Sequence, residues 1–375
     1  MSRVPLSVLD LSPISEGSTA AQALRNTLDL ARQAEEWGYE RYWVAEHHFV
    51  AAASSSPAVL VGLIAAATNR IRVGSAAVQI GHHTAASVVE SFGIVDAVYP
   101  GRIDLGIGRS GQRRAEALAG KDRPQPERKD KIIEGILFPK PFETGKLLLS
   151  ERLLATGEVL VQPKAEAPDF DEQLGDIVAF LRGEFTTPSG VALTATPGSG
   201  AQVELWLFGS SGGQSAQVAG ARGLPFVANY HVSPGTTLDA VEAYRASFVP
   251  SEVLKEPYVV VSADALVAES DEEATYLASS FAQWVYSIRS GHGAIPYPDP
   301  KTVVPLTDEQ SVLVQDRIST RFVGSAATVA EKLDGLQRAT GAEELVVTST
   351  THDHADRLRS YELLGKEWGL PRLRV

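Results

Sequence analysis

The amino-acid sequence predicts an α/β fold in which eight parallel strands close into a (β/α)8 TIM barrel, with insertions after strands 4 and 7. Short apolar runs alternate with helical patterns along the chain, and this alternation is typical of a parallel sheet. The early runs recur about every 30 to 35 residues, roughly the length of one strand-helix unit. The chain has 375 residues, which suits one barrel with extra segments, so we expect a single domain over 1–375.

The expected elements follow one another in the order that a barrel requires. Ala20–Trp37 carries apolar residues on one face at helical spacing, and Gly38 then ends this helix. The expected strands are Leu6–Leu9, Arg41–Ala45, Ile71–Val78, Ile103–Ile107, Val203–Phe208, Leu224–Ala228, Tyr258–Ser262 and Leu345–Thr348. The other expected helices are Pro57–Thr68, Ala85–Val98, Ser215–Ala221, Thr237–Phe248, Glu272–Ile288 and Ala326–Thr340.

Two long stretches interrupt this rhythm. Residues 112–202 are rich in Pro, Lys and Glu, and they hold one clear helix, Asp171–Arg182, and an expected hairpin, Phe185–Val203. Residues 290–314 are rich in proline and begin with the flexible Ser290-Gly291-His292-Gly293. Both stretches follow strands, so on a barrel they would project from the reactive rim as lids or walls.

Bulk composition excludes several classes of protein. Apolar residues make up 44% of the chain, yet no uninterrupted apolar run approaches the length of a membrane span. The formal net charge of −12 argues against a nucleic-acid partner, which requires a basic face. The chain has no cysteine, which excludes disulfides, thiolate metal sites and a cysteine nucleophile. With no cleavable leader at its start, the chain is expected to be cytoplasmic.

Titratable side chains follow several of the expected strands. Glu46, His47 and His48 follow the second strand, His82 and His83 follow the third, and His231 follows the sixth. Strand alternation sends one of His47 and His48 inward and the other outward. Because the carboxyl ends of the strands meet at one rim, their convergence predicts an active site there. Nothing has metal-ligand spacing, so we expect no metal. His352-Asp353-His354 resembles a ligand pair but opens a charged helix, so we expect capping and surface roles there.

Two glycine-rich turns suggest contacts to a phosphate. Gly106-Ile107-Gly108-Arg109-Ser110-Gly111 matches the dinucleotide pattern weakly, because no second strand ending in an acid follows. A strand-end turn with Arg109 as a phosphate fork fits better, and a structural arginine is the alternative. In Gly209–Ser215, small residues and the hydroxyls of Ser210, Ser211 and Ser215 precede a helix, as in a phosphate-monoester site. Ordinary capping needs only one such hydroxyl.

Val73-Gly74-Ser75-Ala76-Ala77-Val78 is a strand with tiny side chains in its middle. Small residues at a barrel rim leave room for a flat ring against the backbone. Tight packing against a neighbouring helix explains the same pattern equally well.

With these residues in hand, the chain resembles the bacterial luciferase-like flavin monooxygenases. The matching stretches are Val44–Phe49, Val73–Val78, Tyr99–Arg109, Leu207–Ser211, Gly223–Phe226, Val323–Ser325 and Leu358–Leu364. The resemblance implies a (β/α)8 barrel that binds reduced FMN or, in some branches, the deazaflavin F420. It assigns the catalytic histidine to His47, with His83 as a further histidine of the subgroup. It also implies a cis peptide at Ala76-Ala77 under the flavin ring, a phosphate-contacting Arg109, and a phosphate cradle of Ser211, Gly212 and Ser215.

The resemblance yields a hypothesis for the reaction. Reduced FMN, supplied by a flavin reductase, would react with O2 through a C4a-peroxyflavin to oxidise a small organic substrate, and His47 would manage a proton. Glu46 would orient His47 or face the barrel wall. Segment 128–168 does not align with the family, so the substrate is open. The family favours a homodimer through helices near 58–67 and 85–98.

Two rival functions remain at this point. An F420-dependent enzyme would transfer hydride without oxygen, and Lys129, Lys131, Lys140 and Lys146 in the insertion could hold the acidic tail of F420. A flavin-binding protein without turnover is the second rival, and the polar strand tips disfavour it.

Overall fold

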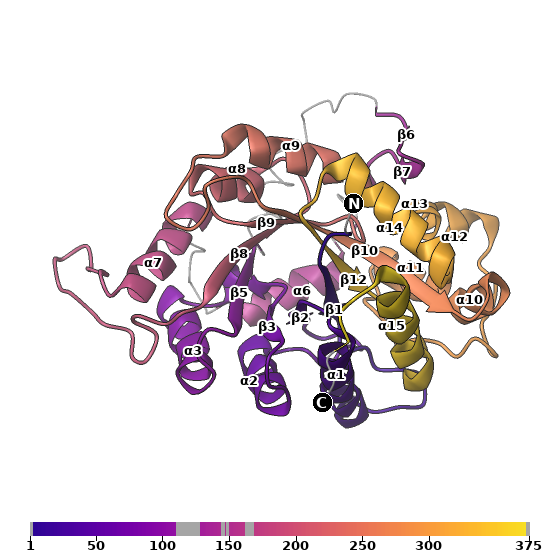
Figure 1. Cartoon of the computed structure of the whole chain (residues 1–375), viewed down its shortest axis with the longest axis horizontal. Coiled ribbons are helices and arrows are strands. Elements are labelled where there is room, and N and C mark those ends of the chain that lie inside the picture. The colour runs from indigo at the N-terminus through magenta and orange to yellow at the C-terminus, as the bar shows by residue number, and fades with distance from the viewer. Residues whose placement is uncertain (1–2, 110–127, 144–146, 148–149, 162–168, 373–375) are drawn as a thin grey trace.

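Eight parallel strands form a closed barrel at the centre of the computed structural model, which describes residues 3–109, 128–143, 147, 150–161 and 169–372 (Figure 1). Each strand pairs with the next in the ring β1-β2-β3-β5-β8-β9-β10-β12, and β12 pairs back with β1. These strands are β1 (Leu6–Asp10), β2 (Arg41–Val44), β3 (Arg72–Ser75), β5 (Ile103–Gly108), β8 (Glu204–Gly209), β9 (Phe226–Ala228), β10 (Val259–Ala268) and β12 (Glu344–Thr348). The predicted TIM barrel is confirmed.

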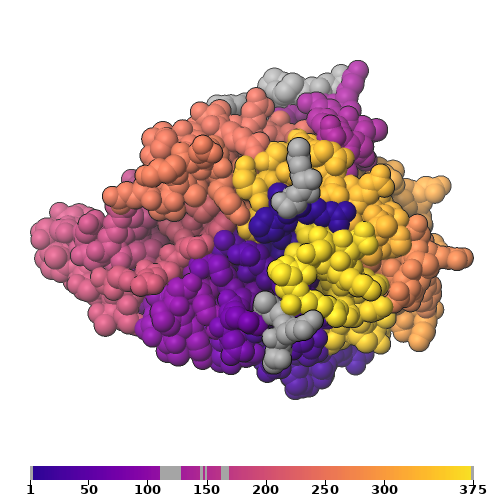
Figure 2. Space-filling model, viewed as in Figure 1, coloured from indigo at the N-terminus to yellow at the C-terminus, as the bar shows by residue number. Residues whose placement is uncertain are grey.

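Most of the helices cover the outer face of the barrel, and a few shorter ones lie near its carboxyl end (Figure 1). They are α1 (Ala20–Trp37), α2 (Pro57–Ala67), α3 (Ala85–Val98), α6 (Glu151–Leu160), α7 (Phe170–Arg182), α8 (Gln214–Ala221), α9 (Thr237–Ser247), α10 (Asp271–Ala278), α11 (Phe281–Arg289), α12 (Asp308–Val312), α13 (Gln315–Thr320), α14 (Ala326–Thr340) and α15 (His354–Trp368). Figure 2 shows the C-terminal residues packed beside the N-terminal segment, where the Trp368 indole donates to the Val4 carbonyl at 2.8 Å. None of the described helices is long and apolar enough to cross a membrane.

The barrel interior is apolar in its middle and ionic at its amino end. The apolar layer consists of Leu9, Trp43, Trp206, Val227, Val260 and Val346. Below it, Arg41 contacts Asp104 at 2.9 Å and Glu344 at 3.3 Å, and Arg72 contacts Asp104 at 2.6 Å. These residues begin their strands, so the ion pairs close the amino end of the barrel. The opposite, carboxyl end is left for the site.

Several elements differ from the prediction. The expected strand 71–78 is divided into β3 and β4 (Val78–Gln79) by a cis peptide at Ala76-Ala77. The expected helix 272–288 is two helices, α10 and α11. The expected hairpin 185–203 is only a tight turn with one bridge, Thr186 to Ala192. Short amphipathic segments escaped prediction: the antiparallel pair β6 (Lys131–Ile133) and β7 (Ile136–Phe138), helix α6, and β11 (Phe322–Ser325), which pairs with β10.

The insertion after β5 spans the carboxyl rim from one side to the other. Its β6–β7 pair lies against α13 and α14, whereas α7 packs against α3 (Figure 1). Segment 290–314 contains α12 and contributes Tyr297 and Val314 to a small apolar core with Phe281 and Trp284. Its Gly293 lies against Arg152 of α6, since a Cβ there would come within 2.7 Å of the Arg152 Nε atom. The two excursions therefore meet above the barrel mouth.

Candidate active site

Two adjoining cavities lie at the carboxyl end of the barrel. The inner one has a volume of about 330 Å³, and the outer one, beneath the insertion, has about 1110 Å³. Both are lined by His47, Gln79, Arg109, Ser210, Ser211 and Gly213, so they lie directly beside one another. The predicted convergence of strand tips on one rim is confirmed.

Glu46 is the centre of a hydrogen-bonded cluster on this rim. Its carboxylate contacts His48 Nε2 at 2.8 Å and His83 Nε2 at 2.9 Å, and it accepts the backbone N–H of Gln79 at 2.8 Å. Burial alone would raise the pKa of Glu46, but the hydrogen bonds from His83, His48 and Gln79 hold it below its ordinary value. The cluster ties the end of β2 to the segment after β3. Glu46 therefore positions this segment and, contrary to one expectation, contacts His48 and His83 rather than His47.

His47 points away from that cluster and into both cavities. Its Nδ1 atom is buried and has no hydrogen-bond partner among the described residues. Burial, together with the nearby His48, lowers its pKa in spite of Glu46. The predicted alternation does not apply, because β2 ends at Val44: both His47 and His48 line the outer cavity, and His47 lines the inner one as well. At neutral pH His47 is a neutral imidazole that can accept a proton.

His231 lies on the same rim and is buried. Its Nδ1 atom lies 2.6 Å from the Ser262 hydroxyl. Burial, followed by the positive charges of Arg317 and His47, lowers the pKa of His231 to about 3. This imidazole is therefore neutral at the pH of the cell.

The inner cavity has a floor of small residues. Ala76 and Ala77, joined by the cis peptide that the resemblance implied, line it together with Gly108. A Cβ at Gly108 would come within 3.2 Å of the Ala77 Cβ atom, and one at Gly106 within 1.9 Å of the Ser75 carbonyl. Small residues are required here because β3 and β5 approach closely, rather than because of a neighbouring helix. The result is a flat backbone surface beside His47.

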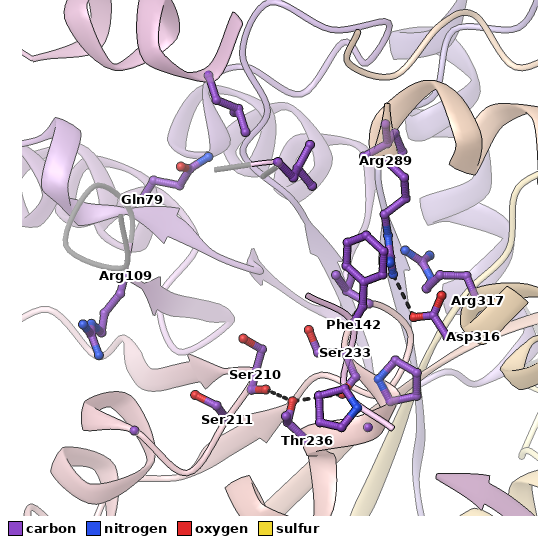
Figure 3. Close-up of a pocket in the computed structure, with 18 of the residues that line it drawn as sticks. Gln79, Arg109, Phe142, Ser210, Ser211, Ser233, Thr236, Arg289, Asp316 and Arg317 are labelled. Atoms are coloured by element: carbon purple, nitrogen blue, oxygen red, sulfur yellow. Dashed lines mark hydrogen bonds and ion pairs between the residues drawn. The ribbon is translucent and has the colours of Figure 1, made fainter. Parts of the chain in front are cut away.

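A cradle of hydroxyls and backbone groups lies at the far end of the inner cavity. Ser210, Ser211 and Ser215 line it at the start of α8, and no described side chain caps this helix at Gly213. A Cβ at Gly213 would lie 3.4 Å from the Ser211 Oγ atom and 4.0 Å from Arg109 Nη1, so the guanidinium and the cradle are neighbours (Figure 3). Gly212 packs against α9, where a Cβ would meet the Asp239 carbonyl at 2.9 Å. A guanidinium beside a helix N-terminus can hold a phosphate.

Two arginines that flank segment 290–314 form part of the outer cavity wall (Figure 3). Arg289, at the end of α11, contacts Asp316 at 2.9 Å, and its guanidinium carbon lies 3.5 Å from the centre of the Phe142 ring. Arg317, on α13, lines the same cavity, and burial lowers its pKa to about 10, so it stays charged at neutral pH. None of these residues was predicted. They follow no predicted strand, and only their tertiary contacts bring them to the rim.

The structure brings most predicted site residues together. His47, Glu46, Ala76, Ala77, Arg109, Ser210, Ser211 and Ser215 all line the inner cavity, and Gly212 lines the outer one. His83 lines neither cavity and acts only on Glu46; His48 and His82 line the outer cavity instead. Sequence reasoning also missed Gln79 and Asn229, each of which directly follows or ends a strand at this rim.

Other sequence motifs proved structural. The closed barrel excludes a Rossmann site at Gly106–Arg109, and Ser110 and Gly111 lie outside the described residues. Asp353 caps α15 by accepting the Ala355 N–H at 2.9 Å, as its position before a charged helix suggested. Within the described ranges, no group of three or more His, Asp or Glu side chains is arranged to hold a metal ion.

A barrel with a cavity at its carboxyl rim, lined by an imidazole, small residues and a hydroxyl-rich turn, has the arrangement of an α/β-barrel enzyme. Residues 4–131 and 173–365 match the sequence model of the luciferase-like monooxygenase family. The chain belongs to this family and is an oxidoreductase of the flavin-monooxygenase type. The unmatched stretch 132–172 lies within the insertion, in agreement with its poor alignment at the sequence level.

Full-length relatives support this membership. The chain is 38% identical to the uncharacterized protein YvbT of Bacillus subtilis, over 97% of this chain and 96% of the relative. It is 33% identical to a luciferase-like monooxygenase of Escherichia coli K12, over 96% of each chain.

Solved structures share the fold. The apo-MsnO8 structure matches with a TM-score of 0.76 and 30% identity, over 99% of this chain and 100% of the other. The oxygenating component of 3,6-diketocamphane monooxygenase from Pseudomonas putida, solved with FMN, matches with a TM-score of 0.64 and 20% identity, over 100% and 99%. An F420-dependent secondary alcohol dehydrogenase matches with a TM-score of 0.60 and 12% identity, over 98% and 99%. The last two likenesses show the fold alone.

Proposed function

We propose that this protein uses reduced FMN, supplied by a separate flavin reductase, and O2 to oxidise a small organic substrate. The observation that carries the proposal is the continuous inner cavity, which runs from the Ala76-Ala77 floor and His47 to the cradle of Ser210, Ser211 and Arg109. A flat ring and a phosphate at the two ends of one ligand fit this shape. The FMN complex of the Pseudomonas putida neighbour supports the same choice of cofactor.

The residues present fit FMN at both ends. Ala76 and Ala77 bring only small side chains to the inner cavity, which leaves room for a ring there. The Ser211 hydroxyl, the α8 N-terminus and Arg109 offer three kinds of phosphate donor. Bound reduced FMN supplies the electrons that activate O2.

The remaining steps belong to the chain's own residues. His47, neutral and facing the cavity, accepts or returns a proton at its imidazole nitrogen while the substrate is oxidised. The Glu46 cluster with His48, His83 and Gln79 holds the segment after β3 in place below it. The insertion and segment 290–314 limit the access of water to the cavity, which favours substrate oxidation over loss of oxidising equivalents.

F420 is the second candidate cofactor, favoured by the fold neighbour that uses it. Lysines at the mouth would be needed for its acidic tail. Lys129, Lys131 and Lys140 are exposed and line neither cavity, and Lys146 lies outside the described residues. The placement of the described lysines therefore favours FMN.

A homodimer through α2 and α3 is part of the proposal. These adjacent helices expose Val59, Leu63, Ile94 and Val98, whose exposed fractions are 64%, 49%, 58% and 63%. Apolar side chains gathered on neighbouring helices are typical of a subunit interface. A diffusible reduced flavin also requires a reductase in the same compartment, for which we propose the cytoplasm.

Anaerobic titration of the purified protein with reduced FMN and, separately, with reduced F420 tests the cofactor. Quenching of tryptophan fluorescence should report saturable binding of FMN and much weaker binding of F420; the reverse order would assign the protein to the F420 branch. His47→Ala should keep FMN affinity within about twofold but release peroxide in place of product. His292→Ala, which changes an exposed imidazole, is the control. Unchanged coupling in the His47 variant would refute the role of this residue.

A further inference from the structure

The outer cavity contains a buried positive charge that the described part of the chain does not neutralise. Only 8% of the Arg317 side chain is exposed. Its one ionic contact among the described residues is Asp264, at 3.9 Å, and Asp264 is already bound by Arg321 at 2.8 Å. The Arg317 guanidinium donates no hydrogen bond to a described residue, and its central carbon lies 5.6 Å from the centre of the Phe281 ring. A buried guanidinium with unused N–H groups is costly unless an anion binds it.

The neighbours of Arg317 do not supply that anion. Asp316 contacts Arg289 at 2.9 Å, and the Nη1 atom of Arg289 is buried without a partner among the described residues. Among the described residues around this point, Asp264 and Asp316 are the ionic partners of Arg289, Arg317 and Arg321, which leaves one positive charge in excess. Nearby His231 is neutral at cellular pH. The other acids lining this cavity, Asp239 and Glu242, lie on α9, the helix that packs against Gly212.

The surroundings of the two arginines indicate the rest of the ligand. Figure 3 shows Arg317 beside the Arg289–Asp316 pair, with Phe142 next to them. Further along the same cavity, Leu153, Leu160 and Val232 contribute apolar surface. A molecule that fits has an apolar body and a single anionic end. The phosphate cradle at Arg109 belongs to a different wall of the space.

We propose that this cavity binds a small organic acid, whose carboxylate is held by Arg317 and by the free Nη1 edge of Arg289. The planar guanidinium matches a carboxylate through paired N–H donors. That this acid is the substrate rests on the proposed monooxygenase function, whereas its binding does not. The acid would place its apolar body between the arginines and His47, which lines the same cavity.

Calorimetry with matched acids and amides tests the proposal without any flavin. The probes are octanoate against octanamide, and 4-phenylbutyrate against 4-phenylbutyramide, which differ in charge at nearly constant shape. Because a hydrogen bond to a charged group contributes about 1.5–3 kcal/mol, the wild type should bind each acid at least about tenfold more tightly than its amide. Equal affinities within about twofold would overturn the proposal.

Variants then test which arginine binds the carboxylate of the acid. Arg317→Gln should weaken acid binding at least about tenfold and leave amide binding within about twofold. Arg128→Gln is the matched control, because Arg128 lines the same cavity but is paired with Asp239. An equal loss in the Arg128 variant would overturn the assignment. If circular dichroism shows that Arg317→Gln does not fold, two other measurements test the proposal. These are the acid affinity of Arg289→Gln and the comparison of acid with amide in the wild type.

Two further titrations distinguish an organic-acid site from a phosphate site and from a part of the cofactor site. Inorganic phosphate should compete with octanoate only weakly; competition as tight as that of the acids themselves would mean a phosphate site and overturn the assignment. The Arg317→Gln variant should bind reduced FMN as tightly as the wild type does. Loss of FMN binding in this variant would mean that Arg317 binds the cofactor, and it would overturn the proposal. A wild type that binds acids but not FMN would support this proposal and refute the proposed function.

Discussion

Burial of a neutral His231 should make the fold sensitive to mild acid, and His231→Asn should remove much of that sensitivity. Burial, Arg317 and His47 lower the pKa of His231 to about 3, whereas an unfolded histidine titrates near 6.5. Below about pH 6.5, His231 therefore binds a proton in the unfolded chain but stays neutral in the folded protein. Stability from this residue is complete above the unfolded pKa and is lost as the pH falls toward the folded one.

The size of the effect follows from these two pKa values. At pH 5 the unfolded imidazole is about 1.5 pH units below its pKa, and the folded one is still neutral. At about 1.36 kcal/mol per unit, the wild type should lose roughly 2 kcal/mol between pH 7.5 and pH 5 through His231. Asparagine can replace the hydrogen bond to Ser262 but cannot titrate. The variant should therefore lack this part of the pH dependence, whatever its stability at pH 7.5.

Urea denaturation followed by tryptophan fluorescence at pH 7.5, 6.5, 5.5 and 5.0, at constant ionic strength, measures the difference. Carboxylates with lowered pKa, such as Asp10 and Glu46, add acid sensitivity to both proteins and cancel in the comparison. His292→Asn, an exposed control, should follow the wild type. The reasoning fails if His231→Asn loses as much stability between pH 7.5 and 5 as the wild type does.

Three other changes probe the barrel, the cradle and the dimer. Arg41→Met should lower the free energy of unfolding by about 3–5 kcal/mol, because it leaves buried carboxylates at the amino end without their partner; a loss below about 1 kcal/mol in urea denaturation would contradict this. Ser211→Ala should weaken reduced FMN about tenfold in anaerobic titration through one lost phosphate hydrogen bond, and Ser189→Ala should not. Ile94→Glu should halve the mass found by light scattering if α2 and α3 form the interface, and an unchanged mass would exclude this face.

The barrel could be predicted because its strands are short, apolar and regularly spaced. All eight expected strands occur, with bounds that differ by a few residues, apart from the division at Ala76-Ala77. Hydrophobic periodicity reports burial, and burial in a closed parallel sheet is nearly continuous. The site residues at strand ends, such as His47 and Ser211, were found for the same reason, since the fold itself brings strand ends to one rim.

The outer cavity could not be predicted in this way. Phe142 lies in the insertion, and Arg289 and Arg317 flank segment 290–314; in these regions no repeated unit fixes the distance between one segment and the next. The split of 272–288 into α10 and α11 also has no strong local signal, because Ser279 and Ser280 are only weak helix breakers. Contacts between segments far apart in the sequence decide these positions. The sequence alone therefore predicts the lining of the inner cavity better than that of the outer one.

The two ends of the barrel treat buried charge differently, and this contrast bears on the substrate. At the amino end the excess is negative: Arg41 and Arg72 face Asp104, Glu204 and Glu344. Burial raises the pKa of Asp104 and Glu344 despite these arginines. The excess negative charge at the amino end can therefore be reduced when one of these carboxylates takes up a proton. Around Arg317, near the carboxyl end, the excess among the described residues is positive, and a guanidinium does not give up its proton near neutral pH. A bound anion would neutralise this charge, and for this reason we propose that the organic acid binds at Arg317.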